Sequence, residues 1–426
     1  MRYEAKLFNP KNRRVERVTN GEQVGLYAPA SSARVSAGSA LLGQVRRAGL
    51  TPATQAWDFL SVALTALAAD ADTRRSASAD GWTREFELVV PVSDPDRWAA
   101  HAPRLSEALS FLTTDRWSLE FTAGKVPYSY PVGKKAHNPV SDCVALLSGG
   151  LDSLIGGVDL VGQKKSPFFV SQSVRGDEAK QVSFARTLGG EHLVLNHNVA
   201  TGRQKETTQR ARSMAFIAYG ALAATTLFEY AFGSRIPLYV SENGYICINP
   251  PLTPLRVGSL STRTAHPRFL RMVQDVFDGV GIEVDIINPY RFKTKGEMMA
   301  ECADVSTLVK AASASTSCGR FQRFNYTHCG RCLPCQVRRA AFLAADIGDA
   351  TDYIFEDLGR DDEEHARFDD VRSVGYALST IDDVGVNRWL GSSLSGVAES
   401  DRPATRDMIA RAVAELGALH ATLGVT

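Results

Sequence analysis

The sequence has 426 residues and a formal net charge of +1, from 48 basic and 47 acidic side chains. This balance gives no general electrostatic basis for binding nucleic acid, so direct nucleic-acid contact is not expected. One hydrophobic core rarely supports a chain of this length, so we expect two or three domains. No apolar run approaches the roughly 20 residues that cross a bilayer, and the start of the chain lacks the apolar core of a signal peptide. These features predict a cytoplasmic protein with no membrane partner.

Residues 1–138 are predicted to form an N-terminal α/β module. Apolar side chains at helical spacing, short β-branched runs and a capped helix start indicate its elements. The predicted elements are a helix over residues 51–69, a strand over 86–92, a helix over 94–112 and a strand over 117–121. We find no chemical motif in this module and interpret it as an accessory, partner-binding module. A segment rich in proline, tyrosine and glycine, residues 124–139, is predicted to be a linker.

A buried strand, a glycine turn and a helix start follow one another within residues 144–158, VALLSGGLDSLIGGV. Glycines leave room for backbone N–H groups to approach an anion, and the helix behind them adds its unsatisfied N–H groups and positive dipole end. The arrangement is typical of a phosphate cradle. A plain strand-to-helix turn capped by Ser148 is the alternative interpretation. The pattern GxxxxGK[ST] is absent, which disfavours ordinary γ-phosphate transfer.

Strands and helices alternate through the second predicted domain, residues 139–345. Alternation of this kind predicts βαβ units and therefore a doubly wound parallel sheet, with ligands at the carboxyl ends of the strands. Predicted strands cover residues 168–173, 192–196, 238–241 and 283–287, and predicted helices cover 178–188, 208–232 and 268–280.

Basic side chains lie where two of the helices are expected to begin. Arg210 and Arg212 precede one apolar helix, and Lys293 and Lys295 lie near the start of another. Cations are unfavourable at a helix N-terminus, so an anionic ligand would explain them, whereas solvated charge is the alternative.

A long segment rich in proline, serine and threonine occupies residues 241–267. Loops of this length inside a compact domain are usually functional. Arg256, Arg263 and His266 could recognise an anionic or purine-like ligand there, or could pair with nearby acids.

Four of the seven cysteines lie close together, at Cys318, Cys329, Cys332 and Cys335. The spacing C-x10-C-x2-C-x2-C suits tetrahedral Zn²⁺, which takes thiolate ligands in closed structural sites. His328 could replace one cysteine, and a redox role for the CxxC pairs is the weaker alternative.

Residues 346–426 are predicted to form a mostly helical C-terminal extension. It begins with an acidic stretch over residues 356–370, and helical patterns follow near 371–381 and 404–423. The second pattern places its apolar residues on one face. A helix packed against the preceding domain is our preferred interpretation over a dedicated binding helix.

Several motifs occur in an order that resembles a known family. They are SGGLDS at residues 148–153, R-x-x-x-F at 212–216, TKGEM at 294–298, and the cysteine cluster followed by VRRAAF at 337–342. This order resembles the 7-cyano-7-deazaguanine synthases, the QueC family of PP-loop ATP pyrophosphatases, over residues 143–345. The resemblance implies a PP-loop fold, ATP with Mg²⁺, structural Zn²⁺ and conversion of a 7-deazaguanine carboxylate into an acyl-adenylate with release of pyrophosphate. In that family ammonia attacks the adenylate, and a second activation yields a nitrile.

The resemblance also implies roles for individual residues. Catalytic roles fall to Asp152, Ser153, Arg212 and Lys295, with Lys295 stabilising charge during adenylation. The four clustered cysteines would bind zinc. The residues expected to hold the pyrophosphate end of ATP are Ser148, Gly149, Gly150, Leu151, Asp152 and Ser153.

The chain departs from the compact synthases in two respects. Residues 241–245, SENGY, stand where those enzymes have a Gly-Tyr-Pro-Asp-Cys segment that shapes the deazaguanine pocket. The added N-terminal module and C-terminal extension resemble the QueC-like proteins of bacterial anti-phage systems, most closely the QatC proteins of Qat systems. That resemblance implies work with partner proteins of the same defence operon, a QatB-like protein first among them.

An acyl-adenylate reacts with whichever amine is positioned beside it. We therefore hypothesise an ATP-dependent ligase that joins a 7-deazaguanine to a partner protein. Three alternatives are a free 7-cyano-7-deazaguanine synthase, an ATP-binding scaffold without turnover, and a tRNA-modifying PP-loop enzyme, which the balanced charge disfavours.

Overall fold

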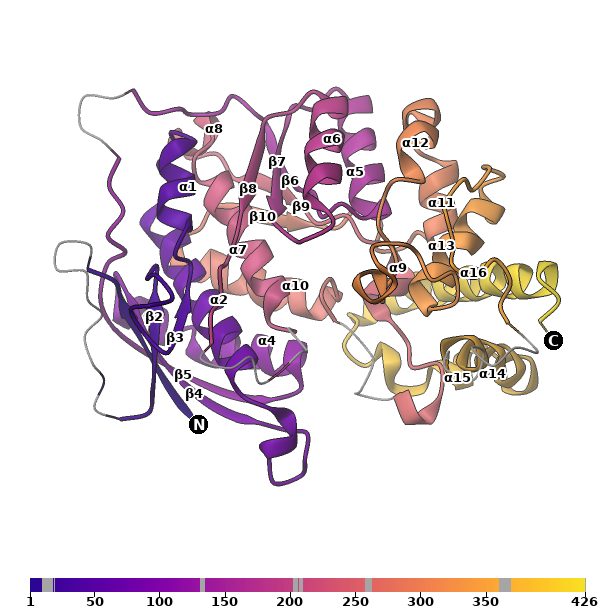
Figure 1. Cartoon of the computed structure of the whole chain (residues 1–426), viewed down its shortest axis with the longest axis horizontal. Coiled ribbons are helices and arrows are strands. Elements are labelled where there is room, and N and C mark those ends of the chain that lie inside the picture. The colour runs from indigo at the N-terminus through magenta and orange to yellow at the C-terminus, as the bar shows by residue number, and fades with distance from the viewer. Residues whose placement is uncertain are drawn as a thin grey trace.

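The computed structural model describes residues 1–9, 18, 20–130, 135–201, 206, 210–256, 263–359 and 369–425. Two five-stranded parallel sheets lie side by side with helices between and around them, and helices near the C-terminus pack beside the second sheet (Figure 1). The chain is therefore an α/β protein, as its strand and helix alternation predicts. Among the described residues, none of the helices is long and apolar enough to cross a membrane.

The first sheet has the strand order β3-β2-β1-β4-β5, and each neighbouring pair is parallel. Its strands are β1 (Arg2–Leu7), β2 (Glu22–Leu26), β3 (Val35–Ala37), β4 (Glu85–Val92) and β5 (Arg116–Ala123). The accompanying helices are α1 (Leu41–Arg47), α2 (Thr54–Asp72), α3 (Pro95–Ala99) and α4 (Ala102–Thr113).

The single helix predicted over residues 94–112 is wrong, because the chain forms α3 and α4 with a break at Ala100 and His101. Pro103 lies in the first turn of α4. A proline inside one continuous helix would lack an N–H donor and would clash with the carbonyl four residues before it. At a helix start neither penalty applies, so the chain begins a new helix there.

The second sheet has the order β10-β9-β6-β7-β8, again with each neighbouring pair parallel. Alternate residues of its central strands face two different cores, as period-two side chains require. Helices α5 and α6 cover one face, and α7 and α10 cover the other. The strands are β6 (Cys143–Leu146), β7 (Pro167–Gln172), β8 (His192–Leu195), β9 (Ile236–Tyr239) and β10 (Val284–Ile287). The helices are α5 (Leu151–Gly162), α6 (Glu178–Leu188), α7 (Arg212–Ala224), α8 (Phe228–Ala231) and α10 (Pro267–Val280).

Both sheets have the same topology. In each, the first strand along the chain is central, the next two extend to one side, and the last two extend to the other. The strand order therefore reverses beside the central strand, and in such sheets ligands bind in the crevice outside the carboxyl ends of the strands at that point. In the second sheet this crevice lies between β6 and β9.

The helix predicted over residues 208–232 is shorter than expected. Residues 207–209 lie outside the described part of the chain, and the remainder divides into α7 and α8. The hydroxyls of Thr225 and Thr226 donate to the carbonyls of Leu222 and Ala223, at 3.0 and 2.6 Å. Threonine side chains that bond back to the preceding turn compete with the helix, and α7 ends at this place.

Helix α2 joins the two sheets. Nearly all of its residues are buried, and it packs along α7 in one continuous apolar core that includes side chains from both sheets. The pair is also tied at both ends. The N–H of Ala53, just before α2, donates to Thr225 Oγ1 at 3.1 Å, and Asp70 near the end of α2 accepts from the N–H of Ala211 at 3.1 Å.

The segment expected to be a long loop, residues 241–267, contains a helix, α9 (Gly244–Ile248), and a 3₁₀ turn, Pro254–Arg256; residues 257–262 lie outside the described part. Residues 360–368 of the acidic stretch also lie outside it. The other helices are α11 (Lys295–Ala300), α12 (Val305–Ala312), α13 (Leu333–Ala344), α14 (Asp369–Val384), α15 (Val386–Leu390) and α16 (Arg402–Thr422). Helices α9, α13, α14 and α16 share one apolar cluster, so the C-terminal helices pack directly on α9 and α13.

Candidate active site at the SGGLDS loop

The SGGLDS loop joins β6 to α5 by a tight turn at the switch point of the second sheet. Gly149 has a φ of +87°, a conformation that side chains rarely adopt, so glycine is required there. Ser153 Oγ accepts from the N–H of Ser148 at 3.2 Å and donates to the carbonyl of Gly150 at 2.9 Å. The N–H of Gly150 donates to Ser148 Oγ at 3.2 Å. These bonds fix the turn at the start of α5, the end at which a helix has N–H groups without partners inside the helix.

A pocket of about 250 Å³ opens beside this loop. Its walls come from the ends of three neighbouring strands and from the first turns of α5 and α7, as the topology predicts. Most of its polar groups are hydroxyls, carboxylates or one guanidinium. The polar residues that line it are Ser148, Ser153, Gln172, Asp177, Arg212, Ser213, Ser241, Glu242 and Thr264.

Asp152 in the first turn of α5 is held from both sides. Lys295 Nζ donates to its Oδ1 at 2.5 Å, and Asn243 donates to its Oδ2 from the backbone at 3.0 Å and from the side chain at 2.7 Å. Burial acts to raise the pKa of Asp152, but the charge of Lys295 and hydrogen bonds from Glu242, Lys295 and the backbone N–H of Asn243 outweigh it and hold the pKa below its ordinary value. Asp152 is therefore a fixed anion.

Glu242 brings a second carboxyl group to Asp152 from the end of β9. Burial raises the pKa of Glu242 well above its ordinary value, and the neighbouring charge of Asp152 raises it further. Two adjacent carboxyl groups cannot both ionise cheaply, so the pair favours a shared proton over two negative charges. The sequence motifs did not point to Glu242 or Asn243, since both lie in the segment expected to be a loop.

Lys295 is the first residue of α11 and is buried. Thr294 and Glu297 form a capping box around it, in which Thr294 Oγ1 accepts from the N–H of Glu297 and Glu297 accepts from the N–H of Thr294. This cap fixes the direction in which Lys295 leaves the helix. The structure thus brings Lys295 to Asp152, and Lys293 instead pairs with Glu301 on the surface at 2.6 Å.

The two arginines predicted at the start of α7 differ in position. Arg212 is the first residue of α7 and lines the pocket. Withdrawal from bulk water lowers the pKa of Arg212, while the charge of Asp177 acts in the opposite direction. Arg210 points to the first sheet instead, where its guanidinium lies 5.3 Å from the centre of the Trp82 ring.

A contact that no motif predicted links the glycine loop to the cysteine segment. The N–H of Thr316 donates to the carbonyl of Gly149 at 2.9 Å. Lys180 Nζ donates to Thr316 Oγ1 at 2.6 Å, and that hydroxyl donates to Asp177 at 2.7 Å. Lys180 also lies 4.2 Å from the centre of the Phe321 ring. The chain just before Cys318 is therefore part of the wall behind the loop.

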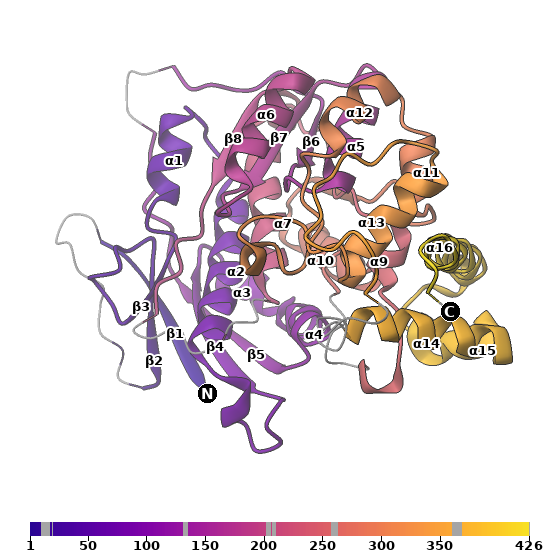
Figure 2. The same ribbon diagram turned by 45° about the vertical axis from the view of Figure 1, so that its right-hand side comes forward.

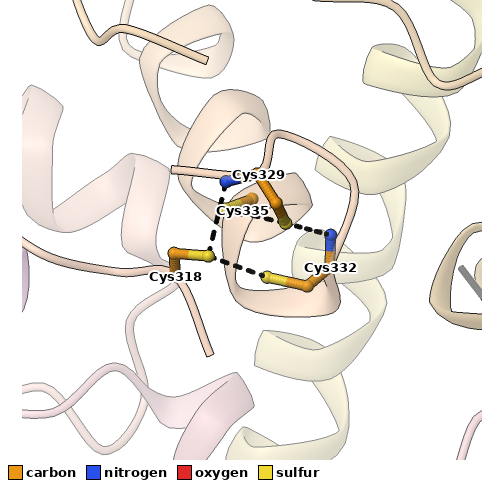
Figure 3. A group of neighbouring side chains, drawn as sticks. All are labelled: Cys318, Cys329, Cys332 and Cys335. Atoms are coloured by element: carbon orange, nitrogen blue, oxygen red, sulfur yellow. Dashed lines mark hydrogen bonds between the residues drawn. The ribbon is translucent and has the colours of Figure 1, made fainter. Parts of the chain in front are cut away.

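The four cysteines of the predicted metal site converge, with their sulfur atoms turned toward one another (Figure 3). All four are buried, and their sulfurs lie within 4.8 Å of one another. The pairs 318–332 and 329–335 are 3.8 and 3.9 Å apart, and sulfurs at the corners of a zinc tetrahedron with bonds of about 2.3 Å are about 3.8 Å apart.

Backbone groups around the cluster favour thiolates. The N–H groups of Arg320 and Cys329 donate to the sulfur of Cys318, at 3.3 and 3.4 Å, and the N–H of Cys332 donates to Cys329 at 3.2 Å. His328 does not join the cluster, because its Nε2 accepts from the N–H of Ser317 at 3.1 Å. The cluster could therefore hold a tetrahedral metal ion such as zinc.

Three basic residues considered for ligand recognition lie elsewhere. Arg256 pairs with Asp370 at 2.6 Å, Arg263 donates to the carbonyl of Phe111 at 3.0 Å, and His266 caps α10 by accepting from the N–H of Arg268. Only Arg256 pairs with an acid, as the second interpretation predicts, whereas Arg263 and His266 bind backbone groups instead. Neither a scan of protein-family models nor a search of curated proteins found a match to this chain.

Proposed function

We propose that this chain is an ATP-dependent ligase that adenylates the carboxylate of a 7-deazaguanine or a related precursor and joins the acyl group to an amine of a partner protein in anti-phage defence. The observation that carries the proposal is the Asp152 and Lys295 pair, held at the start of α5 where the SGGLDS loop opens into a pocket. The motif order of the QueC family supplies the substrate class.

The first step would be attack of a substrate carboxylate oxygen on the α-phosphorus of ATP. The bond from that phosphorus to the bridging oxygen breaks, and pyrophosphate leaves with the electron pair. The loop supports this step because Leu151 and Asp152 begin α5, where backbone N–H groups lack partners within the helix and the dipole favours an anion. Lys295 would neutralise charge that develops on the phosphate oxygens.

Magnesium would fit beside the pocket, which Glu242 lines and next to which Asp152 is buried. Asp152 and Glu242 offer adjacent carboxyl groups, oxygen ligands of the kind that Mg²⁺ prefers together with substrate phosphates. Each carboxyl group disfavours ionisation of the other, and a divalent cation would relieve the same repulsion. The ion would supply charge neutralisation of phosphate oxygens. At the cysteine cluster we propose zinc in a closed, structural role, since four thiolates leave no open position.

In the second step an amine nitrogen would attack the acyl carbon of the adenylate. AMP leaves, an amide bond forms, and the amine loses a proton to solvent. Arg212 across the pocket would hold the phosphate of AMP or the substrate carboxylate, because a guanidinium withdrawn from water favours an anionic partner. The first sheet and the C-terminal helices are surfaces on which a partner, such as the QatB-like protein of the same operon, would dock.

The test is intact-protein mass spectrometry of the operon's partner proteins, coexpressed with this chain in cells that make deazaguanines. We expect a partner with an added deazaguanine mass, and no addition when the chain carries Asp152→Asn. Asp278→Asn on the exposed side of α10 is the matched control and should leave the addition unchanged.

Pyrophosphate release separates the alternatives. Release with the free base, without any mass addition on a partner, would identify a synthase of 7-cyano-7-deazaguanine. ATP binding without pyrophosphate release would identify a scaffold. Either result overturns the ligase proposal, and release that persists in the Asp152→Asn variant overturns the assignment of the loop.

A further inference from the structure

Helix α16 lies against both segments that hold Asp152. It runs beside α13 and α9 on one side and α14 on the other, and it also reaches α11 (Figure 2). Its apolar face is formed by buried residues of the shared cluster, including Met408, Ala412 and Leu416. Three side chains that extend from successive turns of this helix make specific contacts at the site.

Glu415 contacts the residues on either side of Lys295. Its carboxylate accepts a hydrogen bond from Thr294 Oγ1, and another from the N–H of Gly296 at 3.4 Å. The approach is close, because a Cβ built on Gly296 would lie 2.5 Å from Glu415 Oε1. Lys295 is therefore fixed between two residues that α16 holds.

Arg411, one turn earlier, acts on the capping box of α11. Its Nε donates to Glu297 Oε1 at 2.5 Å, and its Nη2 donates to the carbonyl of Phe292 at 3.0 Å. Glu297 is the residue that accepts from the N–H of Thr294. Helix α16 therefore contacts both residues of the capping box, Thr294 through Glu415 and Glu297 through Arg411.

Met408 reaches the other support of Asp152. A Cβ built on Gly244 would lie 2.7 Å from Met408 Cε, so this methionine packs directly on the backbone beside Asn243. The N–H of Gly244 donates to the carbonyl of Lys293 at 2.9 Å, which ties the two supporting segments to each other. One helix therefore braces the donors on both oxygens of Asp152.

We propose that α16 is an integral part of the catalytic site and that Glu415 is a positioning residue, whose reach to Thr294 and Gly296 sets Lys295 against Asp152. This inference rests on the proposed function for its catalytic consequence. Its structural content, the placement of Lys295, can be measured without turnover.

Two substitutions of Glu415 distinguish the effect of side-chain length from the effect of its negative charge. Glu415→Gln keeps the length of the side chain and an oxygen that can accept from Thr294 Oγ1, and it loses only the oxygen that accepts from the N–H of Gly296 at 3.4 Å. Glu415→Asp keeps the charge and shortens the side chain by one methylene. Glu399→Gln, at an exposed position just before α16, is the control.

The first readout is the rate at which an amine-reactive acyl reagent labels Lys295, followed by peptide mass spectrometry. A buried, paired lysine reacts slowly. We expect Glu415→Asp to raise the labelling rate of Lys295 about tenfold, as displacement of about 1 Å from a fixed geometry would allow, and Glu415→Gln to match the unsubstituted chain. Equal labelling in all variants would overturn the inference.

The second readout is the steady-state rate of pyrophosphate release. Glu415→Asp should lower kcat about tenfold and leave KM for ATP nearly unchanged, since Lys295 would act on charge that develops during adenylation. A change confined to KM would contradict a positioning role. If the unsubstituted chain releases no pyrophosphate, the proposed function fails, and the labelling result still decides whether Glu415 positions Lys295.

Discussion

The two sheets share one strand order but differ in where their charged groups lie. In the first sheet the charged groups lie at the amino ends of the strands and neutralise one another. Arg84 and Asp115 directly precede β4 and β5, Asp70 lies in the last turns of α2, and Arg75 follows α2. Arg84 is fully buried and pairs with Asp70 and Asp115 at 2.5 and 2.6 Å. In the second sheet the charges lie at the carboxyl ends, beside a pocket. Both sheets have the strand order that places a ligand crevice at the carboxyl ends, and the second combines it with a glycine turn and a pocket that Arg212 and Glu242 line.

The largest effect is expected at Lys295. Lys295→Gln should lower the rate of pyrophosphate release about a thousandfold, because a fixed cation next to developing phosphate charge is lost. A continuous pyrophosphate assay measures this, with Lys310→Gln on the exposed side of α12 as the control. If the Lys295→Gln variant and the unsubstituted chain released pyrophosphate at rates within about twofold of each other, Lys295 would have no role in the chemistry. The proposed functional difference between the two sheets would then lose its main support.

A substitution at Asp115 tests whether the buried charges of the first sheet serve stability rather than activity. Asp115 accepts from Arg84 at 2.6 Å and from Arg75 at 2.9 Å in a buried network. Asp115→Asn should lower the free energy of unfolding by about 3 kcal/mol, because it leaves buried guanidinium charge uncompensated. Urea unfolding followed by circular dichroism measures the loss. The folded fraction should keep its rate of pyrophosphate release, and a matching loss of rate would mean that this network serves the site.

Loss of the metal should change the structure of the glycine loop, because Thr316 connects the cysteine segment to that loop. Cys332→Ser should release one equivalent of zinc, and the ATP concentration for half-maximal pyrophosphate release should rise about tenfold, because Thr316 holds the carbonyl of Gly149. Metal content by mass spectrometry and ATP titration are the measurements. Cys302→Ala, a buried cysteine outside the cluster, should change neither.

The smallest effect is a pH dependence at Glu415. Burial raises the pKa of Glu415 to about 7; Glu297 on α11 adds to the rise, whereas bonds from Thr294 and Gly296 and the charge of Arg411 oppose it. A folded-state pKa above the ordinary value gives stability that is present at low pH and lost as pH rises through about 7. Between about pH 5 and about pH 8, Tm should therefore fall more in the unsubstituted chain than in the Glu415→Gln variant. Parallel curves would contradict this assignment of the titrating group.

Local sequence patterns predicted many elements of the second sheet but few of the contacts between distant residues. Four cysteines at short spacing and a glycine turn between a strand and a helix are set by neighbours in sequence, so both features could be predicted. Asn243 and Lys295 meet Asp152 from 91 and 143 residues away, and no periodicity encodes such meetings. The same limit explains why Arg210 and Arg212 could not be distinguished: the two side chains are only two residues apart in sequence and point to different sheets.

The two fastenings between α2 and α7 bear on how such a protein could have been assembled in evolution. Ala53 and Thr225 join one end of the pair, and Asp70 and Ala211 join the other. A gene fragment that began at the second sheet would encode α7 without Asp70, which accepts from the N–H at its start, and without α2, which covers its apolar side. Recombination could therefore not replace the first sheet without disturbing the second. A lineage that changed α2 would have needed matching changes in α7, the helix that carries Arg212.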